Sequence, residues 1–417
     1  MRENKPLQVA VVVETIPKVS ETFVLNHITG LIDAGAEVSV FAYYKEESGK
    51  IHPSFHSYQL AQKINYKPGM PGPFIKRIRA AIAVIKKIRK QCPSFLFKAL
   101  NVFKYGAPAF KLHLLYEGAA FISTASFDLV HCHFGTMANR FLRYRKMGLL
   151  NAPLVVSFHG IDMDSPEAGN PAFYRELKKT GKLFIANSEF SKKKLLQLGF
   201  TREKIRVIPV SLDLQAFKRV ERKTKTASEP VIFITVARFI KLKGIEYSIK
   251  AIRDVIQSGY RNVRYRVIGE GPEQENLENL VKESGIGEYV SFTGALPQNQ
   301  VINELEQADI FLLNGIRVDG REETQGLVIQ EAQAMGLPVI VSNIGGVAEG
   351  LTPDVSGFVV PPGNTGAIVE KMIVLINDPA KRIAMGREGR LLVEKKFSNK
   401  QSTIDLLACY KEIISDS

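Results

Sequence analysis

Two glutamates separated by a helix start are the residues of this chain that most clearly predict chemistry. They are Glu323 and Glu331, and the stretch between them carries Gly326, Leu327 and Val328. A helix rises about 1.5 Å per residue, so their spacing covers about 12 Å, roughly the reach from a sugar ring past a diphosphate to a ribose. The free amides of the helix start would lie between the carboxylates, where an anion is favoured. The stretch predicts a sugar-nucleotide site, although two unrelated glutamates beside a surface helix would look the same.

Two cations are placed to bind the same diphosphate. Arg238 and Lys243 follow a predicted strand that ends at Val236, and Gly244 then opens a helix. Arginine offers a planar fork of donors and lysine a point charge, so together they form a diphosphate clamp. For any single lysine, plain surface charge is the simpler explanation, but a position at the end of a strand favours binding.

Turns after the next two predicted strands are rich in glycine. Gly269 and Glu270 end one strand, and Gly294 and Leu296 follow the other. Glycines at these places would let a flat base approach the backbone. Each turn is a weak signal by itself, because glycine is common after strands.

Histidines mark the strand ends in the first half of the chain. His159 follows a strand and precedes Gly160, so its imidazole or carbonyl could face a transferring sugar. A single histidine is more often structural. His131 and His133 resemble a metal pair, but no nearby carboxylate or cysteine set completes a site, so we predict no metal.

The loop after the first strand carries hydroxyl and carboxylate groups. Ser20, Glu21 and Thr22 precede a helical pattern, and Ser20 or Glu21 is expected to cap that helix. We expect this loop, together with His133, to line an acceptor cleft.

Composition fits an α/β enzyme with two domains. The chain has 417 residues, of which 45% are hydrophobic and 24% charged, and this length suits two domains of about 200 residues. Three cysteines that are far apart give no disulfide frame and fit a reducing cytosol. No apolar run reaches about 18 residues, so we predict no membrane span.

Positive charge is concentrated in one segment. The net charge is +14, yet residues 48–116 hold 13 Lys or Arg and no Asp or Glu. Within it, apolar residues from Phe74 to Ile88 recur at helical spacing, and most cations lie on the other side. This pattern predicts contact of residues 63–104 with an anionic membrane surface. An ordinary helix whose apolar side joins the core is the alternative, and nucleic acid is disfavoured because no binding motif accompanies the charge. The expected membrane residues are Lys76, Arg77, Arg79, Lys86, Lys87, Arg89 and Lys90.

Short β-branched runs alternate with helical patterns along the whole chain, which predicts parallel sheets covered on both faces. A polar, strand-free stretch near 209–230 separates two halves, so we expect domains at 1–212 and 213–396, with a final helix at 397–417 that packs back on the first. Two doubly wound, Rossmann-like sheets would then face each other across a cleft at the C-terminal ends of their strands. The predicted strands are 8–13, 38–43, 128–133, 154–158, 183–186, 205–209, 231–236, 265–268, 290–292, 310–313, 339–341 and 358–360.

Taken together, these motifs resemble glycosyltransferase family four, the retaining enzymes of GT-B architecture, over nearly the whole chain. The C-terminal half carries the resemblance most strongly, and the N-terminal half resembles enzymes of the colanic-acid type that build bacterial exopolysaccharides. The loop at 16–22 departs from the double glycine that many members carry after the first strand. The C-terminal motifs are Arg238, Lys243, Gly244, 269–271, 293–294, 323–331, 335–339 and 345–349, and the N-terminal ones are Pro17, 20–23, 131–135 and 158–162.

The resemblance implies a role for each site residue. Glu331 would hold the ribose, and Glu323 would hold hydroxyls of the donor sugar. Arg238 and Lys243 would stabilise the departing nucleoside diphosphate, and His159 would contact the sugar near the reacting carbon. No metal and no cofactor is implied, because the nucleotide sugar is a substrate and the two cations with the helix start take the place of a metal.

The implied reaction moves a sugar from a UDP- or GDP-sugar to a lipid-linked or growing polysaccharide, with retention, in exopolysaccharide or cell-envelope glycan biosynthesis. The enzyme would be cytoplasmic and peripheral at the inner face of the membrane. A disaccharide phosphorylase of the same fold and a non-catalytic nucleotide-sugar-binding protein are the alternatives.

Overall fold

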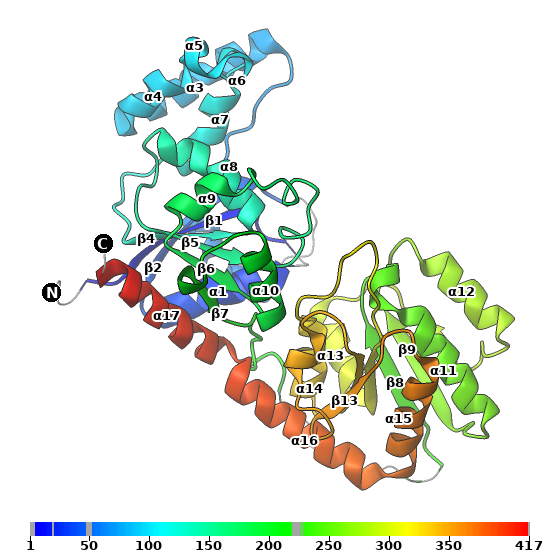
Figure 1. Ribbon diagram of the computed structural model, residues 1–417. Coiled ribbons are helices and arrows are strands. Elements are labelled where there is room, and N and C mark those ends of the chain that lie inside the picture. The colour runs from blue at the N-terminus through cyan, green and yellow to red at the C-terminus, as the bar shows by residue number, and fades with distance from the viewer. Residues whose placement is uncertain (1–4, 19–20, 47–51, 219–225, 227, 416–417) are drawn as a thin grey trace. The chain divides into compact units, whose positions relative to one another are not determined.

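The computed structural model describes residues 5–18, 21–46, 52–218, 226 and 228–415 (Figure 1). The chain divides into two compact units. Unit 1 runs to Asn187 and adds Lys192–Ile208 and the end of the chain from Thr403. Unit 2 consists of Ser188–Ser191 and Pro209–Ser402.

Unit 1 is built on a seven-stranded sheet in which every pairing is parallel. Its order is β3-β2-β1-β4-β5-β6-β7, so the chain winds outward from β1 in both directions. In the register, Val11 lies opposite Val40 on one side and His131 on the other. The strands are β1 (Gln8–Thr15), β2 (Glu37–Tyr44), β3 (Ile64–Tyr66), β4 (Leu129–His133), β5 (Leu154–Phe158), β6 (Leu183–Ala186) and β7 (Ile205–Val207).

Helices cover both faces of this sheet, because successive strand residues point to opposite sides. Val9 and Val11 belong to a core that includes α1 (Thr22–Asp33) and the end of α17 (Asn399–Ser415). Ala10 and Val12 belong to the opposite core. That core includes α8 (Gly135–Lys146), α9 (Arg175–Thr180) and α10 (Glu189–Gln197).

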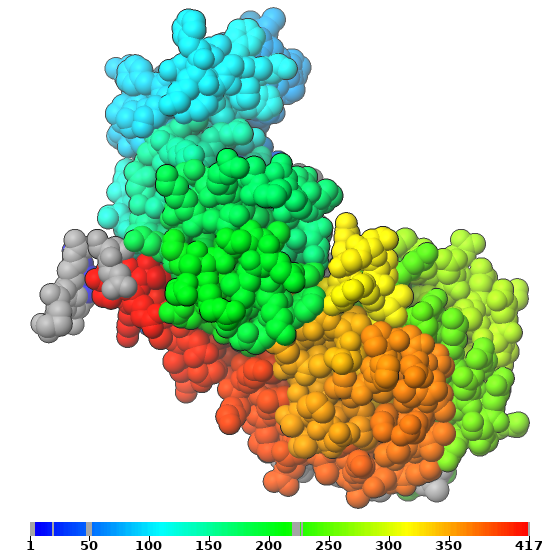
Figure 2. Space-filling model, in the orientation of Figure 1, coloured from blue at the N-terminus to red at the C-terminus, as the bar shows by residue number. Residues whose placement is uncertain are grey.

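A helical insertion between β3 and β4 stands out as a lobe from the sheet-bearing part of unit 1 (Figures 1 and 2). Its longest member, α3, has Pro73 at the N-cap position, where the fixed φ of proline suits a helix start. The insertion consists of α3 (Phe74–Gln91), α4 (Pro93–Ala99), α5 (Val102–Tyr105), α6 (Ala107–Phe110) and α7 (His113–Gly118). Shorter helices of unit 1 are α2 (Pro53–Ser57), η2 (Leu60–Lys63), η3 (Ala119–Phe121) and η4 (Arg202–Lys204).

Unit 2 carries a six-stranded parallel sheet in the order β10-β9-β8-β11-β12-β13. One face packs against α11, α12 and α15, and the other against α13, α14 and α16. Its strands are β8 (Val231–Val236), β9 (Val263–Ile268), β10 (Val290–Phe292), β11 (Ile310–Leu313), β12 (Val339–Ser342) and β13 (Gly357–Val360). Its helices are η5 (Lys241–Lys243), α11 (Ile245–Gln257), α12 (Gln274–Glu283), α13 (Gln298–Gln307), α14 (Leu327–Ala334), η6 (Val347–Gly350), α15 (Thr365–Asn377) and α16 (Pro379–Lys396).

The predicted architecture of two parallel-sheet α/β domains is confirmed, and every predicted strand is present with small changes at its ends. One strand, β3, is missing from the prediction, because it has only three residues and lies at the edge of its sheet. Within the residues that the model describes, no helix combines the length and the apolar character needed to cross a bilayer.

Candidate active site

The sheet order of unit 2 creates a natural binding place between β8 and β11. The chain winds away from β8 in opposite directions on its two sides, so the loops after β8 and β11 diverge and leave a crevice at the strand ends. Arg238 and Lys243 lie in the loop after β8, and Glu323 lies in the long loop after β11. The topology thus brings the predicted cations and the first predicted carboxylate to one edge of the sheet.

Glycines allow these loops to touch through their backbones. Gly244 has φ +62°, and a Cβ added there would lie 1.9 Å from the carbonyl oxygen of Asn314. A Cβ on Gly345, in the loop after β12, would lie 1.9 Å from the carbonyl oxygen of Glu323. Both positions therefore require glycine, and both fix the backbone beside the predicted site.

Lys243 and Glu323 form a direct ion pair, and their side chains are only 15% and 19% exposed. Burial alone would raise the pKa of Glu323, but the ammonium of Lys243 and the guanidinium of Arg238 outweigh it and lower that pKa. Glu323 is therefore an ionised hydrogen-bond acceptor. Arg238 is exposed at the same rim, where its charge remains available to an anion.

Helix α14 begins where the sequence predicts it. Gly326 occupies the N-cap with φ +74°, and Leu327 and Val328 open the first turn. The preceding residue, Gln325, is buried and clasps the backbone of Val210: it accepts from the Val210 amide at 2.8 Å and donates to its carbonyl at 2.9 Å. These two hydrogen bonds fix the loop that leads into the helix, and no motif in the sequence pointed to Gln325.

Glu331 lies one turn into α14 and is half-buried. Burial raises its pKa from 4.5 to about 7. This shift has a different origin from that of Glu323, because no cation offsets the loss of solvent. Perturbed carboxyl groups of this kind are typical of functional sites.

The glycine turns after β9 and β10 have a structural role in addition to the predicted one. A Cβ on Gly269 would lie 1.8 Å from the carbonyl oxygen of Ala237, so glycine is needed for the loops after β8 and β9 to pack. The exposed Glu270 contributes its carbonyl, which accepts from Phe239 at 2.8 Å. Gly294 has φ +73° and open space around it, whereas Leu296 packs against the core. A role of these turns in base binding stays a prediction.

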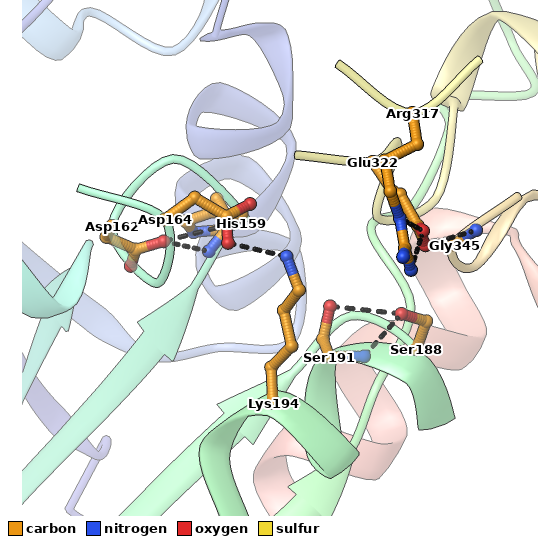
Figure 3. A network of polar contacts seen from close by, with 10 residues as sticks. His159, Asp162, Asp164, Ser188, Ser191, Lys194, Arg317, Glu322 and Gly345 are labelled. Carbon is orange, nitrogen blue, oxygen red and sulfur yellow. Dashed lines mark hydrogen bonds and ion pairs between the residues drawn. The ribbon is translucent and has the colours of Figure 1, made fainter. Parts of the chain in front are cut away.

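Glu322, beside the predicted Glu323, organises the same loop. It pairs with Arg317 and accepts from the amide of Gly345 at 3.0 Å (Figure 3). The only signal of this role in the sequence is a second carboxylate directly before Glu323. Ser188 and Ser191, also of unit 2, bond to each other in the same figure: the Ser191 amide donates to the Ser188 hydroxyl at 3.1 Å.

In unit 1, the predicted histidines lie at the C-terminal ends of β4 and β5. His133 ends β4 and His159 follows β5, and His133 Nδ1 lies 3.0 Å from His159 Nε2. The rings of Phe23 and Phe134 lie 4.4 and 4.8 Å from that of His159. Burial lowers the pKa of His159 to about 3, so the imidazole is neutral.

Asp162 holds the backbone around His159. Its buried carboxylate accepts from the amides of His159 and Gly160 at 3.0 and 2.9 Å and from that of Gly135 at 2.8 Å (Figure 3 shows part of this network). Burial raises its pKa to about 6, even though the backbone hydrogen bonds favour the carboxylate. The sequence shows Asp162 three residues after His159. Only the fold shows that the loops after β4 and β5 meet, so that one carboxylate accepts from Gly135 as well as from His159 and Gly160.

The loop after β1 agrees only in part with expectation. Thr22 begins α1 and Glu21 occupies its N-cap, but the Glu21 carboxylate does not cap the helix. It pairs instead with Lys18 at 2.5 Å, so the capping prediction is wrong for Glu21. The competing cation three residues away explains the difference. Ser20 lies outside the described residues.

The predicted histidine pair has a third neighbour. His27 from α1 lies beside His131 and His133, and one ring nitrogen from each of the three lies within 4.8 Å of the others. Both ring nitrogens of all three histidines already make hydrogen bonds. That no metal binds here stays a prediction.

The comparisons with known proteins agree in both halves of the chain. Residues 20–216 match the model for Glycosyltransferase Family 4, and residues 217–392 match that for group 1 glycosyl transferases. A putative colanic acid biosynthesis glycosyltransferase of Escherichia coli K12 is 30% identical over 360 residues, which are 85% of this chain and 87% of that protein. An amylovoran biosynthesis glycosyltransferase of Erwinia amylovora is 29% identical over 92% of this chain and 94% of its own.

Solved structures share the fold. The Anabaena protein HepE, crystallised with UDP, superposes with a TM-score of 0.67 at 16% identity and covers 97% of this chain and 100% of its own.

Proposed function

The chain belongs to glycosyltransferase family 4, and from that premise we propose that it moves a sugar from a nucleotide-sugar donor to a hydroxyl of a growing or lipid-linked polysaccharide, with retention. The observation that carries this proposal is the edge of unit 2 at which Arg238, Lys243 and Glu323 meet. Its relatives act in the biosynthesis of colanic acid and amylovoran, which supports an exopolysaccharide acceptor.

We assign the nucleotide-sugar donor to unit 2. The amides of Leu327 and Val328 would bind the diphosphate, since a helix start favours an anion, and Glu331 would accept hydrogen bonds from the ribose hydroxyls. Glu323, kept ionised by its cations, would accept from hydroxyls of the transferring sugar. UDP is the first nucleotide to test, because HepE binds it, and GDP is the second.

The pairing of Lys243 with Glu323 suits the chemistry of departure. As the glycosidic bond breaks, negative charge grows on the diphosphate, and a cation already held at the site lowers the barrier without having to reorganise. Arg238 would add a second positive charge from the rim. Unit 1 would bind the acceptor and place His159 near the reacting carbon, with the loop at 16–22 and His133 beside it.

Two neighbouring lysines of η5 test this assignment with a matched control. Lys243→Gln removes the paired cation, and Lys241→Gln removes an exposed one from the same turn. We expect kcat for sugar release from UDP- or GDP-sugars to fall about 100-fold for Lys243→Gln and less than about 2-fold for Lys241→Gln. Equal effects of the two changes would remove Lys243 from the site.

The alternatives predict other products. A disaccharide phosphorylase would release a sugar phosphate from a disaccharide and inorganic phosphate without any nucleotide. A non-catalytic binder would show thermal stabilisation by a nucleotide sugar, about 2.7 kcal/mol at 100 times its Kd, but no turnover.

We further propose that the helical insertion rests on an anionic membrane surface. The first half of the apolar stripe of α3 does not join the core, because Phe74, Ile75, Ile78 and Ile82 are 39%, 68%, 47% and 56% exposed, whereas its far end does, through the buried Ile88. Phe103, on α5, is fully exposed. Residues 48–116 contain no acid, so an apolar and basic surface is presented together, as membrane-surface helices do.

Arg77, one of the predicted membrane residues, has a structural role inside the insertion. The guanidinium of Arg77 donates to the carbonyls of Pro71, Gly72 and Lys111 at 2.9, 2.8 and 3.0 Å and so joins the start of α3 to the end of α6. We therefore exclude Arg77 from the test. The exposed cations Lys76, Arg79, Lys86, Lys87, Arg89 and Lys90 remain, and the last four, which lie close together at the end of α3, are the ones chosen for the test.

Vesicle sedimentation tests the surface. Replacing Ile75, Ile78 and Ile82 by serine removes apolar area, and we expect binding to phosphatidylglycerol vesicles to fall at least about tenfold. Neutralising the four cations should remove the preference for anionic over phosphatidylcholine vesicles, because each contributes about 1 kcal/mol. Leu391→Ser, which removes an apolar residue of α16 that is 45% exposed, is the control. If the triple serine variant and the variant with four neutralised cations both bind vesicles as the wild type does, the insertion is not a membrane-binding surface. The proposed location at the cytoplasmic face of the membrane would then lose its support.

A further inference from the structure

A continuous line of buried polar groups runs through unit 1 beneath His159. It contains four of the chain's seven histidines, and it crosses from the end of β5 to the C-terminal helix α17. In order along the line, the members are His159, His133, His27, Tyr410, His131 and Ser157.

Each neighbouring pair is joined by a hydrogen bond. His133 lies 3.0 Å from His159 and 2.8 Å from His27, measured between ring nitrogens. The Tyr410 hydroxyl lies 3.0 Å from His27 Nε2 and 2.5 Å from His131 Nδ1. The line ends where His131 Nε2 meets the Ser157 hydroxyl at 2.8 Å.

The imidazoles in this line are neutral. Burial lowers the pKa of His27 to about 4 and of His159 to about 3, and it holds those of His131 and His133 well below 6.5, with neighbouring histidines adding to the effect at His131 and His133. A neutral imidazole carries one N–H and one bare nitrogen. Each histidine inside the line can therefore donate on one side only if it accepts on the other.

The donor-to-acceptor direction of one hydrogen bond therefore sets the direction of the other bonds in the line. If Tyr410 donates to His131, His27 must donate to Tyr410, His133 to His27 and His159 to His133. If Tyr410 donates to His27, all of these bonds reverse. An arrangement in which Tyr410 accepts from both histidines would leave its own buried proton without an acceptor, at a cost of about 1–3 kcal/mol.

We propose that this line is a positioning device in which one of the two directions prevails. It thereby holds His159 in one tautomer and sets whether His159 Nδ1 donates or accepts at the sugar. Tyr410 is its key member, because it joins the two histidine segments across the fold. The inference rests on the proposed function only in that His159 contacts the transferring sugar.

A metal bound by His27, His131 and His133 is the competing explanation. The rings of His131 and His133 are stacked, with 5.0 Å between centroids and 26° between planes. Ring lone pairs lie in the ring plane, so those of two stacked imidazoles lie in two separate, nearly parallel planes and do not converge on one ion. The hydrogen-bonded line accounts for every one of these nitrogens, and we favour it.

Nitrogen NMR of the full-length protein with ¹⁵N-labelled histidine tests the tautomer directly. We expect wild-type His159 and His133 to show the two limiting shifts of a single neutral tautomer. Tyr410→Phe keeps the ring but removes the hydroxyl, so these shifts should move towards the average of both tautomers. Tyr116→Phe is the control, because it also removes a buried hydroxyl, which donates to the Arg77 carbonyl at 2.8 Å in the insertion. Identical histidine spectra for wild type and Tyr410→Phe would overturn the proposal.

Kinetics separates positioning from mere support of the fold. For Tyr410→Phe we expect kcat to fall about 10- to 100-fold while KM for the nucleotide sugar changes less than about 2-fold, because the donor nucleotide is assigned to unit 2. A shifted tautomer with unchanged kcat would overturn the positioning role. A single tautomer in a wild type that uses no nucleotide sugar would instead refute the proposed function and leave the histidine line intact.

Metal analysis closes the test. The purified protein should contain no stoichiometric zinc, and added Zn²⁺ should leave the shifts of His27, His131 and His133 unchanged. Zinc bound at one per chain with displaced shifts of these residues would replace the tautomer proposal with a metal site.

Discussion

At the scale of single residues, the two glutamates of the donor site have opposite electrostatic environments. Cations lower the pKa of Glu323 in spite of its burial, whereas burial alone raises that of Glu331 to about 7. Glu323 is thus ionised at any physiological pH. Glu331 titrates close to neutrality, and its proposed contact with the ribose becomes sensitive to pH.

We predict that binding of UDP-glucose, used as the probe, strengthens as pH rises through about 7. If only ionised Glu331 accepts from the ribose, the fraction able to bind grows about tenfold from pH 6 to pH 8 for a pKa of about 7. Calorimetric titration measures this change, and the diphosphate of UDP-glucose does not titrate in this range. Glu331→Gln should bind more weakly and with a flat pH profile. An equally steep profile in Glu331→Gln would assign the titration to another group.

The same shift has a consequence for stability without ligand. The folded pKa of Glu331, about 7, lies above the unfolded value of 4.5, so the folded state holds the proton more tightly. This contribution is complete below pH 4.5 and is lost as pH rises to about 7. Glu331 therefore contributes least to the stability of the fold at the pH where its carboxylate is ionised and able to accept from the ribose.

At the scale of elements, the donor edge depends on how loops after different strands touch. The turn that carries Lys243 ends in Gly244, whose backbone lies against Asn314 after β11. The geometry of the ion pair between Lys243 and Glu323 therefore depends on the backbone contact between Gly244 and Asn314.

A pair of glycine substitutions tests this dependence. Gly244→Ala adds both a left-handed backbone penalty and a clash with the Asn314 carbonyl, whereas Gly285→Ala, with φ +66° and open space, adds only the first. We expect Gly285→Ala to lower the unfolding free energy of unit 2 by about 1–2 kcal/mol and Gly244→Ala by about 2–4 kcal/mol. Denaturant unfolding followed by hydrogen exchange in β8 measures both. Gly244→Ala should also lose activity, and a variant that keeps full activity would show that the turn does not position Lys243.

At the scale of the whole molecule, the C-terminal helix α17 supplies part of the core of the N-terminal unit. The last part of α17 groups with unit 1, and Leu406, Cys409, Tyr410 and Ile413 are buried in the core that contains β1. Unit 1 therefore cannot complete its core until the rest of the chain has been made.

We predict that a chain ending at Ser402 loses the fold of unit 1. Burial of four such side chains contributes about 5 kcal/mol or more, comparable with the stability of a whole domain. Hydrogen exchange should show β1 amides unprotected in this variant, while β8 amides of unit 2 keep their protection. A chain ending at Ser415 retains all four side chains and should behave as wild type. Protected β1 amides in the shorter chain would contradict the prediction.

The sequence by itself determined the local pieces of this protein. Strands such as Val231–Val236 and Ile310–Leu313 are apolar runs bounded by turn residues, and the start of α14 at Gly326 is likewise encoded within a few positions. The residue types after those strands were enough to predict an anion site and to assign the family. Each of these signals depends on neighbours along the chain, so no long-range contact was needed to read it.

Only the tertiary structure decided which distant residues meet. Lys243 pairs with Glu323 across 80 positions, and His27 meets Tyr410 across 383, because sheet order and helix packing bring them together. The apolar stripe of α3 reads the same along its length, yet Ile88 is buried in the core of unit 1 while Ile75, Ile78 and Ile82 are exposed. Periodicity fixes which face of a helix is apolar, but only packing decides what that face meets.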